Sequence, residues 1–218
     1  MKRTITLLTI VTLVVPLVFM VFEPENVGAV NPDERKITAE VTEEISLTGP
    51  ADLLLASSIP GMTGNPGAAA SGSANWTVIT SNGTGYNLKV KASGETGMFQ
   101  SNTAYFYAYT PAGAGSADID WVSPAVGSAE YGFNVFSATA ADVDTPFLNN
   151  AGATCGNGAL STDLKCWYPL ALADLQVIYR TTSTAGIATK MSFKAESNGM
   201  FLNEGYYDSY IIVTAANN

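Results

Sequence analysis

Histidine is absent from the 218 residues of this chain, and charged residues are scarce. The lack of imidazole excludes Ser-His-Asp and Cys-His catalysis and removes the commonest metal ligand. Charged residues make up 13% of the chain, against about 25% in a typical soluble domain, which excludes a coiled coil, a long-helix bundle and a charge-rich disordered chain. The net charge of −9 argues against nucleic acid or an anionic membrane surface as a partner.

Long apolar runs are also absent, except near the N-terminus. Lys2-Arg3 precedes an apolar run over residues 5–22, and a polar stretch then leads to the small residues Val27-Gly28-Ala29. This order is typical of a secretory signal peptide, so we expect residues 1–29 to be removed and residues 30–218 to form one surface domain. The alternative is an uncleaved leader that anchors the chain in a membrane, because roughly 18 apolar residues approach the length of a bilayer span.

Cysteine occurs twice, as Cys155 and Cys166, in a segment rich in glycine and asparagine. In an exported chain, a single pair at this spacing predicts a disulfide bond. Closing so short a loop contributes on the order of 3 kcal/mol in the chain-entropy model. A zinc site is the alternative interpretation, although two thiolates without histidine leave the ion short of ligands.

Alternation of apolar and polar side chains dominates the rest of the chain and predicts an all-β fold. We expect strands at residues 36–47, 53–55, 76–80, 86–92, 103–110, 131–136, 175–179, 187–195 and 206–215. Clusters of Gly, Pro, Asn and Ser separate these segments, as turns require. The expected architecture is a single antiparallel β-sandwich, Ig-like or jelly-roll-like, over about residues 36–215. An irregular insertion at about residues 137–172 carries the predicted disulfide.

An internal repeat runs through this pattern. Leu88 to Thr110 aligns with Met191 to Thr214, so that Gly97-Met98-Phe99 matches Gly199-Met200-Phe201. We interpret each Gly-Met-Phe as a tight turn followed by two apolar residues that plug the end of the core. Paired binding loops are the alternative interpretation. Two related units favour one sandwich over a repeat array, which needs about three or more units.

Two segments resemble known families of surface proteins. Asn75 to Ser93 has a Trp-x-Val strand followed by a Gly-Tyr-x-Leu strand and resembles the core of bacterial WxL-type cell-surface domains, with Val78 in place of the motif's leucine. Glu204 to Ala215 resembles the closing strand of those domains, and of secreted fibre and coat β-sandwiches of the TasA and spore-coat-U kinds. The resemblance implies an exported surface β-sandwich and, for the WxL type, attachment to peptidoglycan.

Carboxylates are the remaining conventional acid–base groups. Asp118 and Asp120, like Asp142 and Asp144, place two acids on one face of an extended segment, roughly 6.5 Å apart at the Cα atoms. Together with Glu130 they could supply a glycosidase pair, and the four aspartates are weak calcium candidates. Neither stretch has the acid density of a dedicated calcium loop. We therefore expect solvated loop acids, no catalysis and no cofactor.

Aromatic side chains are the candidates for contact with a ligand or partner. Tyr105, Tyr107 and Tyr109 fall on one face of a predicted strand, and Trp76 opens another. If exposed, such a stripe would stack on sugar rings or on a neighbouring subunit. If covered, it would form a layer of the core.

These observations lead to three hypotheses of function. The first is a secreted, non-catalytic cell-surface structural protein that forms part of an extracellular layer or fibre, or that associates with the cell wall. The second is a carbohydrate-binding adhesion module that docks onto cell-wall glycan, and the third is a carboxylate-based glycoside hydrolase. Self-association would use the edges of strands, and residues 36–47 are the candidate for strand exchange. Pairing of that strand within its own sandwich is the alternative.

Overall fold

The computed structural model describes residues 38–62, 67–101, 104–113 and 116–218. The predicted leader, residues 1–29, lies outside this part of the chain. A compact unit runs from Thr42 to Asn218, and Met1–Val41 forms a separate unit of which only residues 38–41 are described. Within the described ranges, no helix has the length and apolar character needed to cross a membrane.

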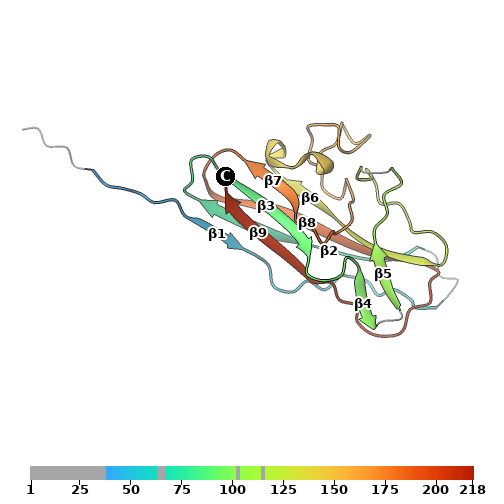
Figure 1. Ribbon diagram of the computed structural model, residues 1–218. Helices are drawn as coiled ribbons and strands as arrows, with labels where there is room; N and C mark the ends of the chain where they lie inside the picture. Colours follow the sequence, from blue (N-terminus) through green and yellow to red (C-terminus); the bar gives the residue numbers. More distant parts are fainter. Residues whose placement is uncertain (1–37, 63–66, 102–103, 114–115) are drawn as a thin grey trace, which may run out of the picture. The chain divides into compact units, whose positions relative to one another are not determined.

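The prediction of an all-β protein is confirmed, because the described chain consists of two β-sheets and their connections. The strands are β1 (Ile45–Thr48), β2 (Ala68–Thr80), β3 (Tyr86–Ala92), β4 (Met98–Ser101), β5 (Ala104–Ala108), β6 (Ser128–Ser137), β7 (Leu175–Arg180), β8 (Thr184–Asn198) and β9 (Ile211–Asn217). The larger sheet has the order β1-β2-β8-β6-β5-β4 and curls like half of a barrel (Figure 1). The smaller sheet has the order β7-β3-β9.

One pairing departs from the expected antiparallel pattern. β5 and β6 run parallel, with Tyr107 opposite Glu130, whereas the other strand pairs are antiparallel. Residues 109–127 separate these two strands, which is long enough to bring the chain back to the end from which β5 started. A short hairpin turn cannot do this, so the parallel pairing follows from the length of the connection.

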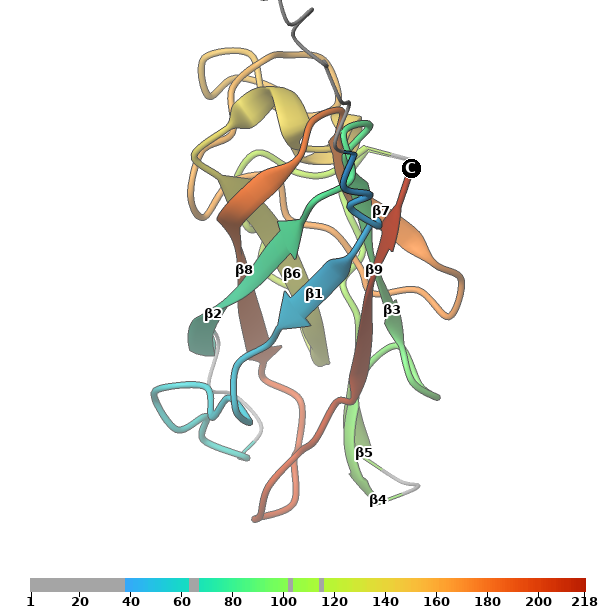
Figure 2. The same cartoon turned by 90° about the vertical axis from the view of Figure 1, so that its left-hand side faces the viewer.

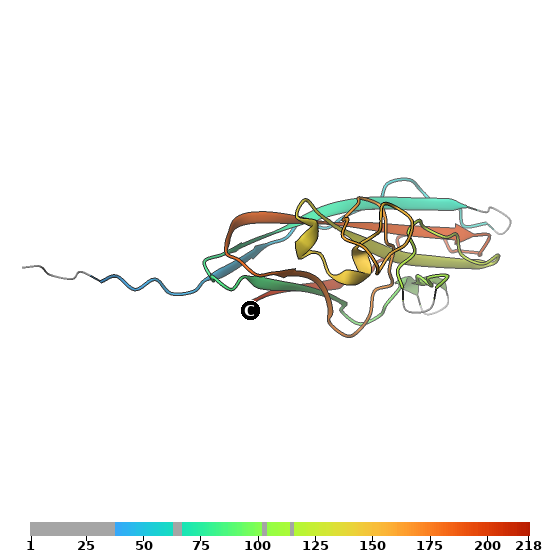
Figure 3. The ribbon, with the colours of Figure 1, turned by 90° about the horizontal axis from the view of Figure 1, so that it is seen from above.

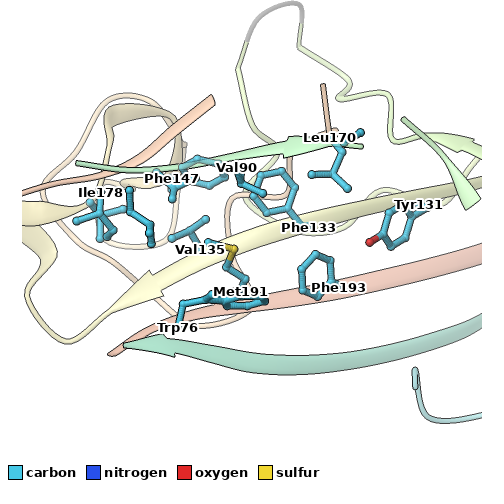
Figure 4. Packing of buried hydrophobic residues seen from close by; sticks show 14 of the residues in the cluster. Trp76, Val90, Tyr131, Phe133, Val135, Phe147, Leu170, Ile178, Met191 and Phe193 are labelled. Carbon is cyan, nitrogen blue, oxygen red and sulfur yellow. The ribbon is translucent and has the colours of Figure 1, made fainter. Parts of the chain in front are cut away.

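Inward-facing residues of both sheets form one hydrophobic core (Figure 4). β3 shows the predicted alternation most clearly, because Tyr86, Leu88 and Val90 are buried while the residues between them are half-buried. The larger sheet contributes fully buried side chains such as Phe133 and Met191. Burying each large apolar side chain stabilises the fold by about 1.5–3 kcal/mol, which makes this shared cluster the main attachment between the sheets.

The irregular insertion is confirmed, with the disulfide that was predicted for it. Cys155 and Cys166 are bonded, and the segment also contains the short 3-10 helices η1 (Ala140–Asp142) and η2 (Thr145–Phe147). Figure 3 shows these helices, in yellow, beside the sheets. Phe147 is buried in the core, and Tyr168 exchanges two backbone hydrogen bonds with Phe133 of β6, at 2.9 and 2.8 Å. The insertion is therefore attached to the larger sheet at several points.

Three predicted strands were wrong in extent. Residues 38–44 lie outside any strand, because the regular pairing with β2 begins only at Ile45, opposite Thr80. Residues 36–37 lie outside the described part. Residues 53–55 are not a strand, and only Ala56 bridges to Ser71 of β2. Residues 206–210 are likewise irregular, so β9 begins at Ile211.

β2 begins eight residues earlier than predicted. Its first half reads Ala-Ala-Ala-Ser-Gly-Ser-Ala, a composition with low intrinsic preference for strands. Pairing with β8 overrides this preference, because Ala68 to Thr77 lie opposite Ser197 to Ala188 in continuous register.

The two methionines of the internal repeat occupy the expected positions in the core, but the two units do not share one architecture. Met98 and Met200 both pack against the core, as the plug interpretation expects. Phe201, however, is 61% exposed. The aligned strands also belong to different sheets, because β3 is the centre of the smaller sheet and β8 is internal to the larger one.

Candidate functional site

A deep groove opens where the edges of the two sheets meet. One wall is β1 with the connection that follows it, residues 49–62, which we call the strap. The other wall is the start of β9 with the preceding connection, residues 201–210, which we call the aromatic connection. Figure 2 shows β1 and β9 beside each other at this edge. The volume of the groove is about 1280 Å³, enough for several residues of a peptide or for a small apolar ligand.

The floor of the groove is apolar and belongs to the core. It is formed by Trp76, Met98, Phe106, Tyr131 and Phe193. These five side chains come from β2, β4, β5, β6 and β8, so the larger sheet presents its concave face to the groove. Burial raises the pKa of the Tyr131 hydroxyl, which keeps this residue neutral in the floor.

Two small residues, Ala70 of β2 and Ala195 of β8, line the groove. The inward positions of β2 at Ala70, Gly72 and Ala74 carry one side-chain carbon or none, and Ala195 of β8 adds a fourth small residue. Leu53 and Leu55 of the strap cover Gly72, where a Cβ atom would lie 3.3 Å from their methyl groups. The small inward side chains of β2 thus let the strap pack closely over Gly72 and leave part of the groove open at Ala70.

Both sheets present a free edge at the groove. β1 pairs with β2 on one side, β9 pairs with β3 on one side, and no strand of the described chain covers the other side of either. The Thr80 hydroxyl donates a hydrogen bond of 2.9 Å to Asn217 Oδ1 and ties β2 to β9. Beyond this tie, unpaired strand edges offer backbone donors and acceptors to an added strand.

The rim of the groove concentrates exposed apolar side chains. Leu54, Met62, Phe201, Tyr206 and Tyr210 line it, and each is more than 60% exposed. A contiguous apolar surface of this kind marks an interaction site more often than scattered single residues do. Three acidic residues, Asp52, Glu204 and Asp208, also line the groove, and the described lining includes neither Lys nor Arg. The groove is therefore apolar and acidic.

Backbone contacts fix the two connections that form the walls. The Leu202 N–H donates to the Gly61 carbonyl at 2.9 Å and joins the aromatic connection to the strap. A Cβ atom on Gly61 would lie 2.2 Å from the Leu202 carbonyl oxygen, so only glycine fits there without a shift of the backbone. The Gln100 side chain donates to the Glu204 carbonyl at 2.8 Å. These hydrogen bonds hold both walls of the groove in defined positions.

Trp76 is the one predicted contact residue that the structure brings to the groove. Tyr107 is 45% exposed and lies outside the lining, and the side chain of Tyr105 lies outside the described part. Tyr109 is buried, stacks on Trp121 with ring centroids 4.4 Å apart, and donates a hydrogen bond of 2.5 Å to Asp118. Burial and this hydrogen bond raise the pKa of Tyr109.

The predicted acids are spread over the fold, and each is bonded to another group of the chain. Asp118 is bonded to Tyr109, Asp120 to Lys165, Asp142 to Arg180, Asp144 to Gln176, and Glu130 to the Thr110 N–H. None of the five lines the groove. Among the described residues, no group of three or more His, Cys, Asp or Glu side chains is arranged to hold a metal ion.

Sequence reasoning missed most of the groove because its walls are connections rather than strands. Residues 53–55 of the strap and residues 206–210 of the aromatic connection were both predicted as parts of strands. A usable signal was present: Leu53-Leu54-Leu55 and Tyr206-Tyr207 are apolar runs inside segments that lack strand partners. Such runs indicate a surface that is covered only when something binds.

Comparison of the chain with protein-family models, with curated proteins and with solved structures finds no match.

Proposed function

We propose that this chain is a secreted, non-catalytic surface protein whose copies associate into an extracellular layer or fibre. The observation that carries the proposal is the apolar groove between the free edges of β1 and β9. An added strand would gain backbone hydrogen bonds along an edge and would cover apolar side chains that otherwise face water. In this proposal the two sheets act as one β-sandwich subunit, and the leader is cleaved after Ala29.

Two further features support a structural role over catalysis. The acids that could have formed a glycosidase pair are bonded to other groups of the chain, outside the groove. The chain is polar mainly through Ser, Thr, Asn and Gly, so few ions need to lose water when copies pack closely.

Assembly of the chain that begins at Val30 tests the proposal. Light scattering and electron microscopy over rising protein concentration should show a growing population of ordered oligomers. A chain that stays monomeric up to the limit of its solubility would overturn the proposal. N-terminal sequencing of the exported protein checks the cleavage site in the same preparation.

Carbohydrate binding remains the second candidate, because Tyr206 and Tyr210 expose aromatic rings at the rim of the groove. Such rings stack on sugars. The floor, however, is formed by apolar side chains with few groups that could bond sugar hydroxyls, and this favours an apolar occupant. Sedimentation of the monomer with purified cell-wall glycan would shift the assignment to adhesion.

A further inference from the structure

We propose that the groove binds residues 35–41 of a second copy of this chain, which enter as an extended segment between the strap and the aromatic connection. This inference rests on the proposed function and names the partner of the groove. It also revises the expected exchange of residues 36–47, because residues 45–48 already form β1 within their own subunit.

The chemistry of the segment fits an apolar groove. Ile37, Ala39 and Val41 alternate with Lys36, Thr38 and Glu40, so an extended chain would place the three apolar side chains on one face. In the described part of this segment, residues 38–41 are all exposed and lie in no strand, and Val41 is 85% exposed. The two apolar side chains of the described part, Ala39 and Val41, are thus exposed, just before the compact unit Thr42–Asn218 begins.

Hydrogen bonds next to β1 argue that the segment fills the groove of another copy. The Ser81 N–H donates to the Glu44 carbonyl, the Glu44 N–H donates to Ser81 Oγ, and Ser81 Oγ donates to the Thr42 carbonyl. These bonds hold residues 42–44 beside the end of β2, at the start of β1, while the groove begins at Leu47.

To reach the groove of its own subunit, the preceding segment would have to reverse its direction at these bonded residues. Thr42-Glu43-Glu44 contains none of the glycine, proline or asparagine residues that favour such a turn. A neighbouring subunit needs no such reversal. Each copy would therefore give one segment and accept one, a heterologous contact that builds rings or open filaments.

The charges and sizes of the two partners agree. Arg35-Lys36 is the only pair of adjacent basic residues after the leader, and the acids in the groove lining are Asp52, Glu204 and Asp208. Opposite charges of this kind favour the correct partner and speed its encounter. The groove, of about 1280 Å³, is lined by the small residues Ala70 and Ala195 and has room for isoleucine, alanine and valine side chains above its floor.

Point variants in the chain that begins at Val30 provide the first test. Val41→Asp would place a charge against the apolar floor, and we expect it to raise the concentration needed for assembly by roughly tenfold or more. Thr38→Asp is the matched control, because the same charge falls on the opposite face, and it should assemble like the parent. Equal assembly of parent and both variants would overturn the inference.

A peptide experiment provides the second test and separates the inference from the proposed function. The chain 42–218, which corresponds to the compact unit, should stay monomeric and bind a synthetic peptide of residues 35–41 by titration calorimetry. The peptide with Ile37→Asp and Val41→Asp should not bind. If chain 42–218 assembles as the parent does and the peptide fails to bind, assembly uses another surface and the inference falls while the proposed function stands. If the parent itself never assembles, both fall.

Discussion

A single buried amide, Asn82, organises the turn between β2 and β3. Its Nδ2 donates to the Gly85 carbonyl at 2.9 Å, and its Oδ1 accepts from the backbone and the hydroxyl of Thr84, both at 3.0 Å. Asn82→Ala leaves these backbone groups without their partner, so we expect the free energy of unfolding to fall by about 1–3 kcal/mol. Urea titration followed by fluorescence measures the change.

Asn75→Ala is the matched control for that variant, because Asn75 lies exposed in β2. It should change the free energy of unfolding by about 0.5 kcal/mol or less. Equal losses in the two variants would show that the Asn82 side chain is not what holds the turn.

Buried tyrosines make the stability depend on alkaline pH. Burial raises the pKa of Tyr131 above its usual value of about 10, so the folded state keeps a proton that the unfolded state loses. The free energy of unfolding should therefore fall as the pH rises above about 10, by up to about 1.4 kcal/mol per pH unit for each such group.

Urea titrations between about pH 9 and about pH 11 test this dependence. Tyr131→Phe should reduce the loss of unfolding free energy at alkaline pH, because it removes one of the groups that cause this loss. Tyr206→Phe, at a site 76% exposed, should keep the slope of the parent. Equal slopes for Tyr131→Phe and the parent would contradict the assignment to this residue.

Among the larger elements, the insertion depends on its disulfide. The bond between Cys155 and Cys166 closes a short loop, and both sulfur-bearing residues are buried. Replacing both with serine should lower the free energy of unfolding by on the order of 3 kcal/mol. Urea titration of the double variant and of the parent, each with and without reductant, checks this: reductant should weaken only the parent. If the parent and the double variant are equally stable without reductant, the disulfide does not contribute to the free energy of unfolding.

Strands with strong alternation were the elements that sequence could predict. β3 was placed without error, and β7 nearly so, because buried and half-buried positions alternate or form apolar runs there. The first half of β2 and the extent of β1 were missed, since both depend on what neighbouring backbone is available. The parallel pairing of β5 and β6 was missed for the same reason, because it depends on the path of a long connection.

Of the candidate site, sequence predicted Trp76 as a contact residue, but not the groove itself. Small side chains line part of the hollow, at Ala70 and Ala195, and their inward position is known only from the pairing of β2 with β8. The walls are connections, whose paths depend on tertiary contacts such as that between Gly61 and Leu202. Alternation patterns carry no information about such contacts.

For the molecule as a whole, a protease should cleave the chain before the boundary between Val41 and Thr42 much faster than the compact unit that follows it. In the chain that begins at Val30, kept dilute enough to be monomeric, a glutamate-specific protease should cut early after Glu40, which lies in an exposed segment outside any strand. Glu196 is 3% exposed within β8 and should stay intact until the fold opens. Mass spectrometry of the digest over time tests this, and a first cut inside β8 would contradict the order.

The position of β9 in the smaller sheet has a consequence for when the chain can fold. β3 needs β7 and β9 as neighbours, yet β9 is the last strand to be synthesised, and Asn217 and Asn218 bond to the β2 strand end and the β2–β3 turn far back in the sequence. Pairings between such distant segments form slowly, and here they cannot begin until Ile211–Asn217 has left the ribosome. The smaller sheet is therefore incomplete in a growing chain until β9 has emerged, although β3 and β7 are made earlier. If the chain is exported as proposed, late completion of the smaller sheet would leave it unfolded during transport, so that folding and oxidation of Cys155 and Cys166 follow on the far side of the membrane.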